Sequence, residues 1–335
     1  MIIGGRVMGA LKLYLSMYGT LTLIIAISTL FFAAILTWIG SLNLFVLAVI
    51  VIMFNLLQWL FAPRMIETLY RVREVKPNEN PKLYRIVESL SRKMGFKEMP
   101  KVMVANLPIP NAFAYGSPLT GNRVAVTKEL LRVLEDEEVE AVVGHELGHL
   151  KHKDVQIMMF VSVLPAIFYF LGYSLLLSGW FGGWRGYESR NGGGPVVALA
   201  IGGICLLIYW ILSLFVLGLS RYREYYADRE SVIRVEDGAR KLSEALAKIV
   251  YHTGRLKGYQ RREIGNLSSF KTLFISDPDR AERDSLEISS FKRVSDQQLV
   301  NEILSRKITL ADRIMEIFST HPNIVKRLKA LRELA

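Results

Sequence analysis

Four long stretches of this chain contain no Asp, Glu, Lys or Arg, and each must lie either in lipid or in a protein core. Each is long enough to supply the about 20 apolar residues that a helix needs to cross a bilayer. A signal peptide is the alternative for the first stretch, but that stretch is longer than a signal peptide needs and a second follows at once. We therefore predict four transmembrane helices in two hairpins. The stretches run from Tyr14 to Ile39, Asn43 to Ala62, Val155 to Trp180 and Pro195 to Ser220.

Charged residues are concentrated outside these stretches. The chain has 42 Lys and Arg residues against 31 Asp and Glu residues, a formal net charge of +11, and a hydrophobic content of 51%. This combination indicates separate membrane and soluble parts, with the lipid bilayer as a partner. The basic residues flank apolar segments and no nucleic-acid motif is present, so we predict no nucleic-acid partner. Cys205, the single cysteine, can form no intramolecular disulfide.

The positions of the cations predict the orientation of the spans. Lys and Arg precede the first span, follow the second and bracket the last pair, whereas the loop between the first two spans carries no charge. Because cytoplasmic loops carry an excess of Lys and Arg, we expect a multi-pass protein of the cell membrane with both termini cytoplasmic. The flanking cations are Arg6, Lys12, Arg64, Arg71, Arg73, Lys76, Lys151, Lys153, Arg221 and Arg223.

The charged remainder is expected to form one cytoplasmic domain that the second hairpin interrupts. Its first part contains an amphipathic helix from Pro81 to a stop at Gly95, three short β-prone runs, and a helix that begins at the acidic residues 135–138. The β-prone runs, at 102–105, 112–115 and 124–127, predict a small antiparallel sheet. Residues 257–306 are highly charged with weak periodicity and receive no assignment. The predicted boundaries are 1–63 for the first hairpin, 64–154 for the first part of the domain, 155–220 for the second hairpin and 221–335 for the second part.

An HExxH motif, His145-Glu146-Leu147-Gly148-His149, lies in the last of these helices. With about 3.6 residues per turn, the two histidines project from nearly the same face, where neutral imidazoles can bind one zinc ion. Glu146 lies beside them and can take a proton from a zinc-bound water and later deliver it to a leaving amine. Ordinary helix histidines are the alternative. The chain has only five His, so finding two at this spacing around Glu favours a metal site.

A catalytic zinc site usually has three protein ligands and one open position, so a third ligand is expected. Glu224 is the strongest candidate because it follows the fourth span, which returns the chain to the membrane face of His145. Asp228 lies one helical turn later and could accept a hydrogen bond from a ligand imidazole. The alternative is that both acids form surface ion pairs with Arg221, Arg223 or Arg229.

Several ordered segments resemble one known family, the HtpX-like membrane metalloproteases, which are relatives of the CaaX prenyl proteases. The matching segments are Asn111-Ala112-Phe113-Ala114, Gly144 to His149, Arg223 to Asp228, and Ser319-Thr320-His321-Pro322 followed by Arg327. Together with the four-span layout, the resemblance covers nearly the whole chain except the region after Lys257.

The resemblance implies a mainly α membrane protein with four transmembrane helices and a gluzincin-like α+β metalloprotease domain. It implies one Zn²⁺ per chain on His145, His149 and Glu224, with Glu146 as general base and acid. The substrates would be polypeptides, namely membrane or misfolded proteins cleaved at the cytoplasmic face, which is typical of protein quality control and stress response.

By the same resemblance, Asn111, Ala112, Phe113 and Ala114 would form an active-site edge strand that pairs with an extended substrate. A plain sheet strand is the alternative. His321 and Arg327 match positions that could stabilise the oxyanion or contact substrate, although they could also cap the final helix and carry a solvated charge. Asp154, five residues after His149, could contact the motif helix, but we expect it to cap the third span.

Two other functions fit part of this pattern. A CaaX-type protease would act on prenylated C-termini, but four spans and the His321 region favour the HtpX-like pattern. A transporter that binds a permeating metal through HExxH would place ionisable residues within its spans, and the four stretches contain no Asp, Glu, Lys or Arg.

Overall fold

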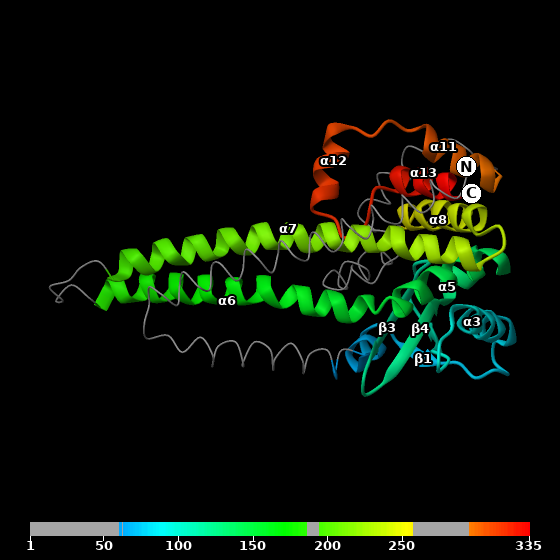
Figure 1. Ribbon diagram of the computed structural model, residues 1–335, viewed down its shortest axis with the longest axis horizontal. Helices are drawn as coiled ribbons and strands as arrows, with labels where there is room; N and C mark the ends of the chain where they lie inside the picture. Colours follow the sequence, from blue (N-terminus) through cyan, green and yellow to red (C-terminus); the bar gives the residue numbers. More distant parts are fainter. Residues whose placement is uncertain (1–59, 62, 186–193, 257–294) are drawn as a thin grey trace. The chain divides into compact units, whose positions relative to one another are not determined.

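The computed structural model describes residues 60–61, 63–185, 194–256 and 295–335, and these divide between two compact units (Figure 1). The first unit, which we call the α/β unit, comprises Trp59–Val155 and Ser220–Ala335 within the described ranges. The second, the hairpin unit, comprises Gln156–Leu219. The first predicted span, nearly all of the second, and most of the unassigned segment 257–306 lie outside the described residues.

The α/β unit contains a four-stranded sheet in the order β1-β2-β4-β3. The strands are β1 (Val72–Glu74), β2 (Lys101–Ala105), β3 (Ala112–Ser117) and β4 (Gly121–Thr127). The prediction of an antiparallel sheet is wrong in one pairing, because β2 and β4 run parallel while β1–β2 and β3–β4 are antiparallel. The chain after β2 passes to the edge position to form β3, and the tight turn at Gly121, where φ is +72°, then brings β4 back between β2 and β3 in the direction of β2.

Helices cover this sheet and extend the core. The predicted amphipathic helix is confirmed as α3 (Pro81–Met94), which Asn80 caps through a hydrogen bond from Leu83 N and which ends at Gly95 with φ +78°. The core also includes α5 and α8, and α8 contacts the terminal helices α11 and α13. The bounds are α4 (Lys128–Val133), α5 (Asp136–Lys151), α8 (Gly238–Gly254), α11 (Asp296–Ser305), α12 (Leu310–Ile317) and α13 (Ile324–Leu334).

Helix α5 begins where the acidic residues predict it. Glu138 accepts a hydrogen bond at 2.8 Å from the backbone of Glu135, and it pairs with Lys248 of α8 at 2.8 Å. The carboxylate therefore satisfies an orphan donor of the helix start while tying α5 to α8. Acidic side chains at this end also favour the positive end of the helix dipole.

Two long helices connect the units, α6 (Asp154–Arg185) and α7 (Gly194–Arg234). Helix α7 is the one helix among the described residues that is long and apolar enough to cross a membrane, with a mean hydropathy of 2.5 over its most apolar window. Four transmembrane helices therefore remain a prediction. Within the hairpin unit, α6 and α7 pack closely at Gly172, where a methyl group would lie 3.0 Å from the carbonyl of Gly202.

Candidate metal centre

Helix α5 presents His145 and His149 on one buried face. Their Nε2 atoms lie 3.2 Å apart, and the rings meet edge to face at a centroid distance of 4.7 Å. His145 is only 1% exposed. The helical spacing therefore directs both imidazoles to one point in the interior of the α/β unit.

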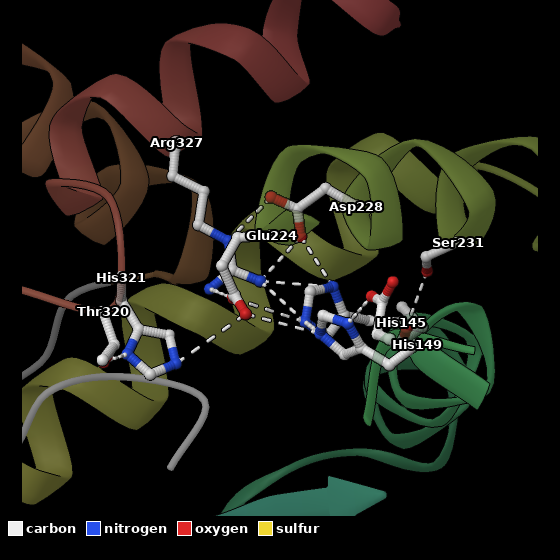
Figure 2. Close-up of polar contacts among 10 residues, drawn as sticks. His145, His149, Glu224, Asp228, Ser231, Thr320, His321 and Arg327 are labelled. Atoms are coloured by element: carbon white, nitrogen blue, oxygen red, sulfur yellow. Dashed lines mark hydrogen bonds and ion pairs between the residues drawn. The ribbon is translucent and has the colours of Figure 1, made fainter. Parts of the chain in front are cut away.

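Glu224 reaches the same point from α7. Its Oε2 lies 3.6 Å from Nε2 of His145, and its Oε1 lies 3.4 Å from Nε2 of His149. One candidate ligand atom from each of the three residues falls within 4.8 Å of the other two. Figure 2 shows the Glu224 carboxylate between the two α5 imidazoles and His321. The structure thus brings together the three residues that the sequence suggested as a ligand set.

The chemistry of these donors fits a zinc ion. Two imidazoles and one carboxylate form a common catalytic zinc set. Oε2 of Glu224 is buried and makes no hydrogen bond among the described residues, although Nη1 of Arg327 lies 3.2 Å away. Burial raises the pKa of Glu224, but His321, Arg327 and the α5 histidines outweigh it and hold that pKa well below its usual value. The side chain is therefore a carboxylate with a lone pair available for a metal.

Asp228 holds His145 from one helical turn further along α7. Its Oδ1 lies 2.8 Å from Nδ1 of His145, and its two oxygens accept hydrogen bonds of 2.7 Å from Arg327. Asp228 and Arg327 are each 2% exposed, so they form a buried ion pair. Arg327 therefore pairs with carboxylates of the site, and the alternative that it carries a charge solvated on the helix surface is wrong.

Asp154 makes the equivalent contact with His149. Its Oδ2 lies 2.6 Å from Nδ1 of His149, and its Oδ1 lies 3.1 Å from Nε of Arg223. Asp154 is the first residue of α6, but its carboxylate faces the motif helix. The expectation that it caps the third span is therefore wrong. The spacing of five residues after His149 was the available signal for this contact. Carboxylates behind both imidazoles are typical of metal-binding histidines, whose tautomers they fix.

Glu146 is buried beside the ligand set and 4% exposed. Burial raises its pKa, while His145 and His149 oppose that effect. A carboxylate whose pKa lies above the ordinary value is a better proton acceptor than an exposed one. Its position and its basicity therefore suit proton transfer at this site.

His321 approaches Glu224 from the loop between α12 and α13. Its Nε2 lies 3.8 Å from Oε1 of Glu224, and its Nδ1 lies 2.9 Å from the hydroxyl of Thr320. Arg221 holds this loop, because its Nη1 donates to the carbonyls of Glu316, Ile317 and Ser319 at 2.7, 3.0 and 2.7 Å. Sequence reasoning did not assign this role to Arg221, since the carbonyls it binds are distant in the chain.

The Asn111–Ala114 segment lies at the edge of the sheet. Strand β3 ends the strand order, pairs with β4 on one side and packs against α5. Asn111 is anchored to the end of β4, where its N–H donates to the Thr127 hydroxyl at 2.9 Å and its carbonyl accepts from Thr127 N at 2.8 Å. The segment is buried.

A helix with paired imidazoles, a carboxylate from a second helix and a buried acid beside them is the arrangement of a metalloprotease. The model of peptidase family M48 matches residues 77–335, and the chain belongs to this family. The resemblance stated from the sequence is thereby confirmed.

The chain is similar to protease HtpX homologs along most of its length. A protease HtpX homolog from Thermoplasma acidophilum is 39% identical over 295 residues, covering 87% of this chain and 86% of the relative. A protease HtpX homolog from Archaeoglobus fulgidus is 33% identical over 333 residues, covering 99% and 90%. Among solved structures, the crystal structure of S. mikatae Ste24p covers 96% of this chain and 67% of its own at a TM-score of 0.50 and 18% identity, which shows a shared fold.

Proposed function

We propose that this metalloprotease is a membrane-embedded zinc endopeptidase that hydrolyses peptide bonds of membrane or misfolded proteins at the cytoplasmic face. The observation that carries the proposal is the convergence of His145, His149 and Glu224 within 4.8 Å of one another. These three residues would hold the metal. Bound there, zinc supplies a Lewis acid that polarises the peptide carbonyl and lowers the pKa of water.

Glu146 would move the proton in this reaction. It takes a proton from the attacking water and returns it to the amine of the departing peptide. Its raised pKa allows both steps, because a carboxylate that binds a proton more readily can store it between attack and departure. Asp228 and Asp154 hold the two imidazoles in place from behind.

Of the two candidates for oxyanion stabilisation, the contacts favour His321. Arg327 already donates to both oxygens of Asp228 and lies 3.2 Å from Glu224, so its charge offsets those two carboxylates. His321 instead meets the ligand set from a loop, with Nε2 toward Glu224 (Figure 2). A donor in this position can stabilise the charge that develops on the carbonyl oxygen.

Strand β3 would bind the substrate backbone. It occupies an edge of the sheet and packs on the helix that carries the motif. An extended polypeptide added at such an edge gains main-chain hydrogen bonds regardless of its side chains. This mode suits an enzyme that takes unfolded segments of many sequences.

The membrane location is supported by α7, whose apolar part leads directly into the segment that carries Glu224. The proposal places the active site near the bilayer surface. The chain would cross the membrane four times, with the active site on the cytoplasmic side.

The decisive test is Glu146→Gln in the full chain purified in detergent. We expect kcat for casein cleavage to fall at least about 100-fold, because the proton acceptor is lost while the metal ligands stay. Zinc content should remain at the level of the parent protein. Glu140→Gln, on the same helix but paired with Lys93 and Lys241, is the matched control and should cleave normally. Undiminished cleavage by the zinc-loaded Glu146→Gln variant would contradict the mechanism.

A further inference from the structure

Helix α12 carries an apolar face that is exposed to solvent. The four side chains of this face are 74%, 49%, 45% and 57% exposed, in the order Leu310, Ile314, Ile317 and Phe318. Their spacing of four, three and one residues places them on one side of the helix. A helix with one apolar and one polar side needs an apolar partner to be stable.

Contacts within the α/β unit hold the other side of α12 in place. The apolar face therefore stays exposed in the folded state. Glu316 is buried, accepts a hydrogen bond from Asn323 N at 3.1 Å, and pairs with Lys326. The hydroxyl of Thr309 caps the first turn, where it accepts from Asp312 N at 3.1 Å. Figure 1 shows α12 set apart from α8, α11 and α13, which pack together.

Arg221 ties the end of α12 to the residues that directly follow the uncharged stretch of α7. This residue directly follows Ser220, the last residue of the uncharged stretch, and its Nη1 binds the carbonyls of Glu316 and Ile317 at the end of α12. The first arginine after a membrane span lies at the level of the lipid headgroups. An arginine at that level would keep the end of α12 beside the headgroups through these contacts.

A second exposed apolar stripe lies around the end of the predicted second span. Phe61, at the end of the predicted second span, and Met65 and Leu69 just after it are spaced four residues apart, and each is more than 40% exposed. One stripe lies where the chain leaves an uncharged stretch, and the other is tied to such a point through Arg221, so both indicate an apolar partner. A bilayer surface meets that requirement.

The charges around α12 match this partner. Lys307 and Arg313 are exposed beside the apolar face, whereas the Asp312 carboxylate accepts a hydrogen bond from Thr309 N at 2.9 Å and Glu316 is held as described above. Interfacial helices have this combination, because cations attract anionic headgroups while apolar side chains enter the acyl boundary. A second copy of the chain is a poorer fit, since a stable protein interface needs about 800 Å² from each partner and α12 has only eight residues.

We propose that α12 is an interfacial helix that lies on a membrane containing anionic lipids, with Leu310, Ile314, Ile317 and Phe318 inserted at the headgroup level. The proposal rests on the membrane location proposed above, but not on catalysis. Helix α12 leads directly into the loop that carries His321, which lies 3.8 Å from Glu224. The bilayer thus supports one wall of the active site and favours polypeptide segments that lie at the membrane surface.

The test measures the depth of single labelled positions in the full chain. In a Cys205→Ala background, Ile314→Cys or Phe318→Cys carries an environment-sensitive fluorophore, and the protein is placed in nanodiscs of phosphatidylcholine and phosphatidylglycerol. Nitroxide lipids then quench from near the headgroup or from the chain end. Lys329→Cys, at an exposed position of α13, is the control outside the lipid, and Ile204→Cys in the apolar part of α7 is the control inside it.

We expect headgroup-level nitroxide to quench the probes at Ile314 and Phe318 at least about twofold more than the probe at Lys329. Quenching at Ile204 without quenching at Ile314 and Phe318 would overturn the interfacial role of α12. A blue-shifted, unquenched probe at Ile314 would also overturn it and would indicate a protein partner such as a second copy. Absence of quenching at Ile204 would instead overturn the membrane location itself. Labelled proteins that unfold at the temperature of the parent show that the labels do not disturb the fold.

Discussion

Arg327 and Asp228 form a buried ion pair on which the arrangement of this site depends. Two buried ions are costly to desolvate, and removing one partner leaves the other uncompensated. Here the pair also contacts His145, so one substitution would act on stability and on the proposed metal binding together. Separating these two effects requires more than one variant.

We predict that Asp228→Asn weakens zinc binding about 10-fold to 100-fold, because Nδ1 of His145 loses its anionic acceptor. Competition with a fluorescent chelator measures this change. The variant should also unfold more easily, since Arg327 keeps its charge. The double variant Asp228→Asn/Arg327→Met should regain part of that stability while its zinc affinity stays low.

Asp237→Asn is the matched control for this substitution. Asp237 is exposed, pairs with Arg240, and has φ of +55°, a conformation that Asn also adopts readily. The Asp237→Asn variant should bind zinc with the same affinity as the parent protein. If Asp228→Asn also binds zinc as tightly as the parent, the positioning role of Asp228 is wrong.

At the scale of elements, α5 and α7 approach closely through the glycines of the motif helix. A methyl group on Gly148 would lie 3.2 Å from Cα of Ala227 and 3.2 Å from Cβ of Glu230. One on Gly144 would lie 3.1 Å from the hydroxyl of Ser231. Small residues at these positions let the two histidines and Glu224 face each other across the helix pair.

We predict that Gly148→Ala lowers both the Tm and the zinc affinity. Alanine favours the helical backbone by about 1 kcal/mol, but overpacking against backbone atoms costs about 1 to 3 kcal/mol and pushes the ligands apart. Thermal unfolding and chelator competition measure the two effects. Gly203→Ala in α7, where an added methyl group meets no atom within 4 Å, should leave zinc affinity unchanged. A Gly148→Ala protein with parental affinity would show that α5 and α7 are not rigidly spaced.

The same helix pair contains a pH-dependent contact outside the proposed metal ligands. Glu230 of α7 lies 3.5 Å from His152, 3.0 Å from Lys151 and 3.4 Å from Arg234. Its contacts with His152 and Lys151 lower the pKa of Glu230 to about 2, although burial opposes them. Because the folded pKa lies below the unfolded value, the contact stabilises the fold above about pH 4.5 and is lost as the pH falls toward 2.

We predict that Glu230→Gln lowers the free energy of unfolding at pH 7. The difference in this free energy between the variant and the parent protein should become smaller as the pH falls from about 4.5 to about 3. Denaturant unfolding at a series of pH values measures this difference. Glu236→Gln, at an exposed position, should match the parent throughout. A difference that stays constant down to pH 3 would show that ionisation of Glu230 contributes nothing.

At the scale of the whole molecule, the α/β unit is assembled from two separate lengths of chain. His145 and His149 precede the second uncharged hairpin and Glu224 follows it, so the proposed metal would join two parts of one domain. A ligand that binds only the folded state stabilises that state in proportion to its binding free energy. The metal would therefore hold the unit together as well as serve catalysis.

We predict that chelating zinc lowers the Tm of the full chain by roughly 10 °C, on the basis of a contribution of about 4 kcal/mol from tight binding. Differential scanning fluorimetry with and without a chelator measures the shift. Glu224→Ala should unfold at a lower temperature than the zinc-loaded parent and should not respond to the chelator. A large chelator response in Glu224→Ala would show that the metal binds elsewhere.

The sequence by itself determined the features that depend on local spacing. HExxH places two imidazoles on one helical face whatever surrounds the helix, and the caps at Asn80 and Gly95 bound α3 through contacts within a few residues. Glu224 could be suggested because it follows an uncharged stretch. The same reasoning left a surface ion pair open as an alternative for Glu224, since nothing in the local sequence distinguishes a metal ligand from an ion-paired surface acid.

Only the tertiary structure decided the contacts between distant segments. The parallel pairing of β2 with β4, the burial of Arg327 against Asp228 and the anchoring of the His321 loop by Arg221 all join residues far apart in the chain. Side-chain periodicity carries no information about such partners, because many pairings bury the same apolar surface. Which of them forms depends on how the whole domain packs.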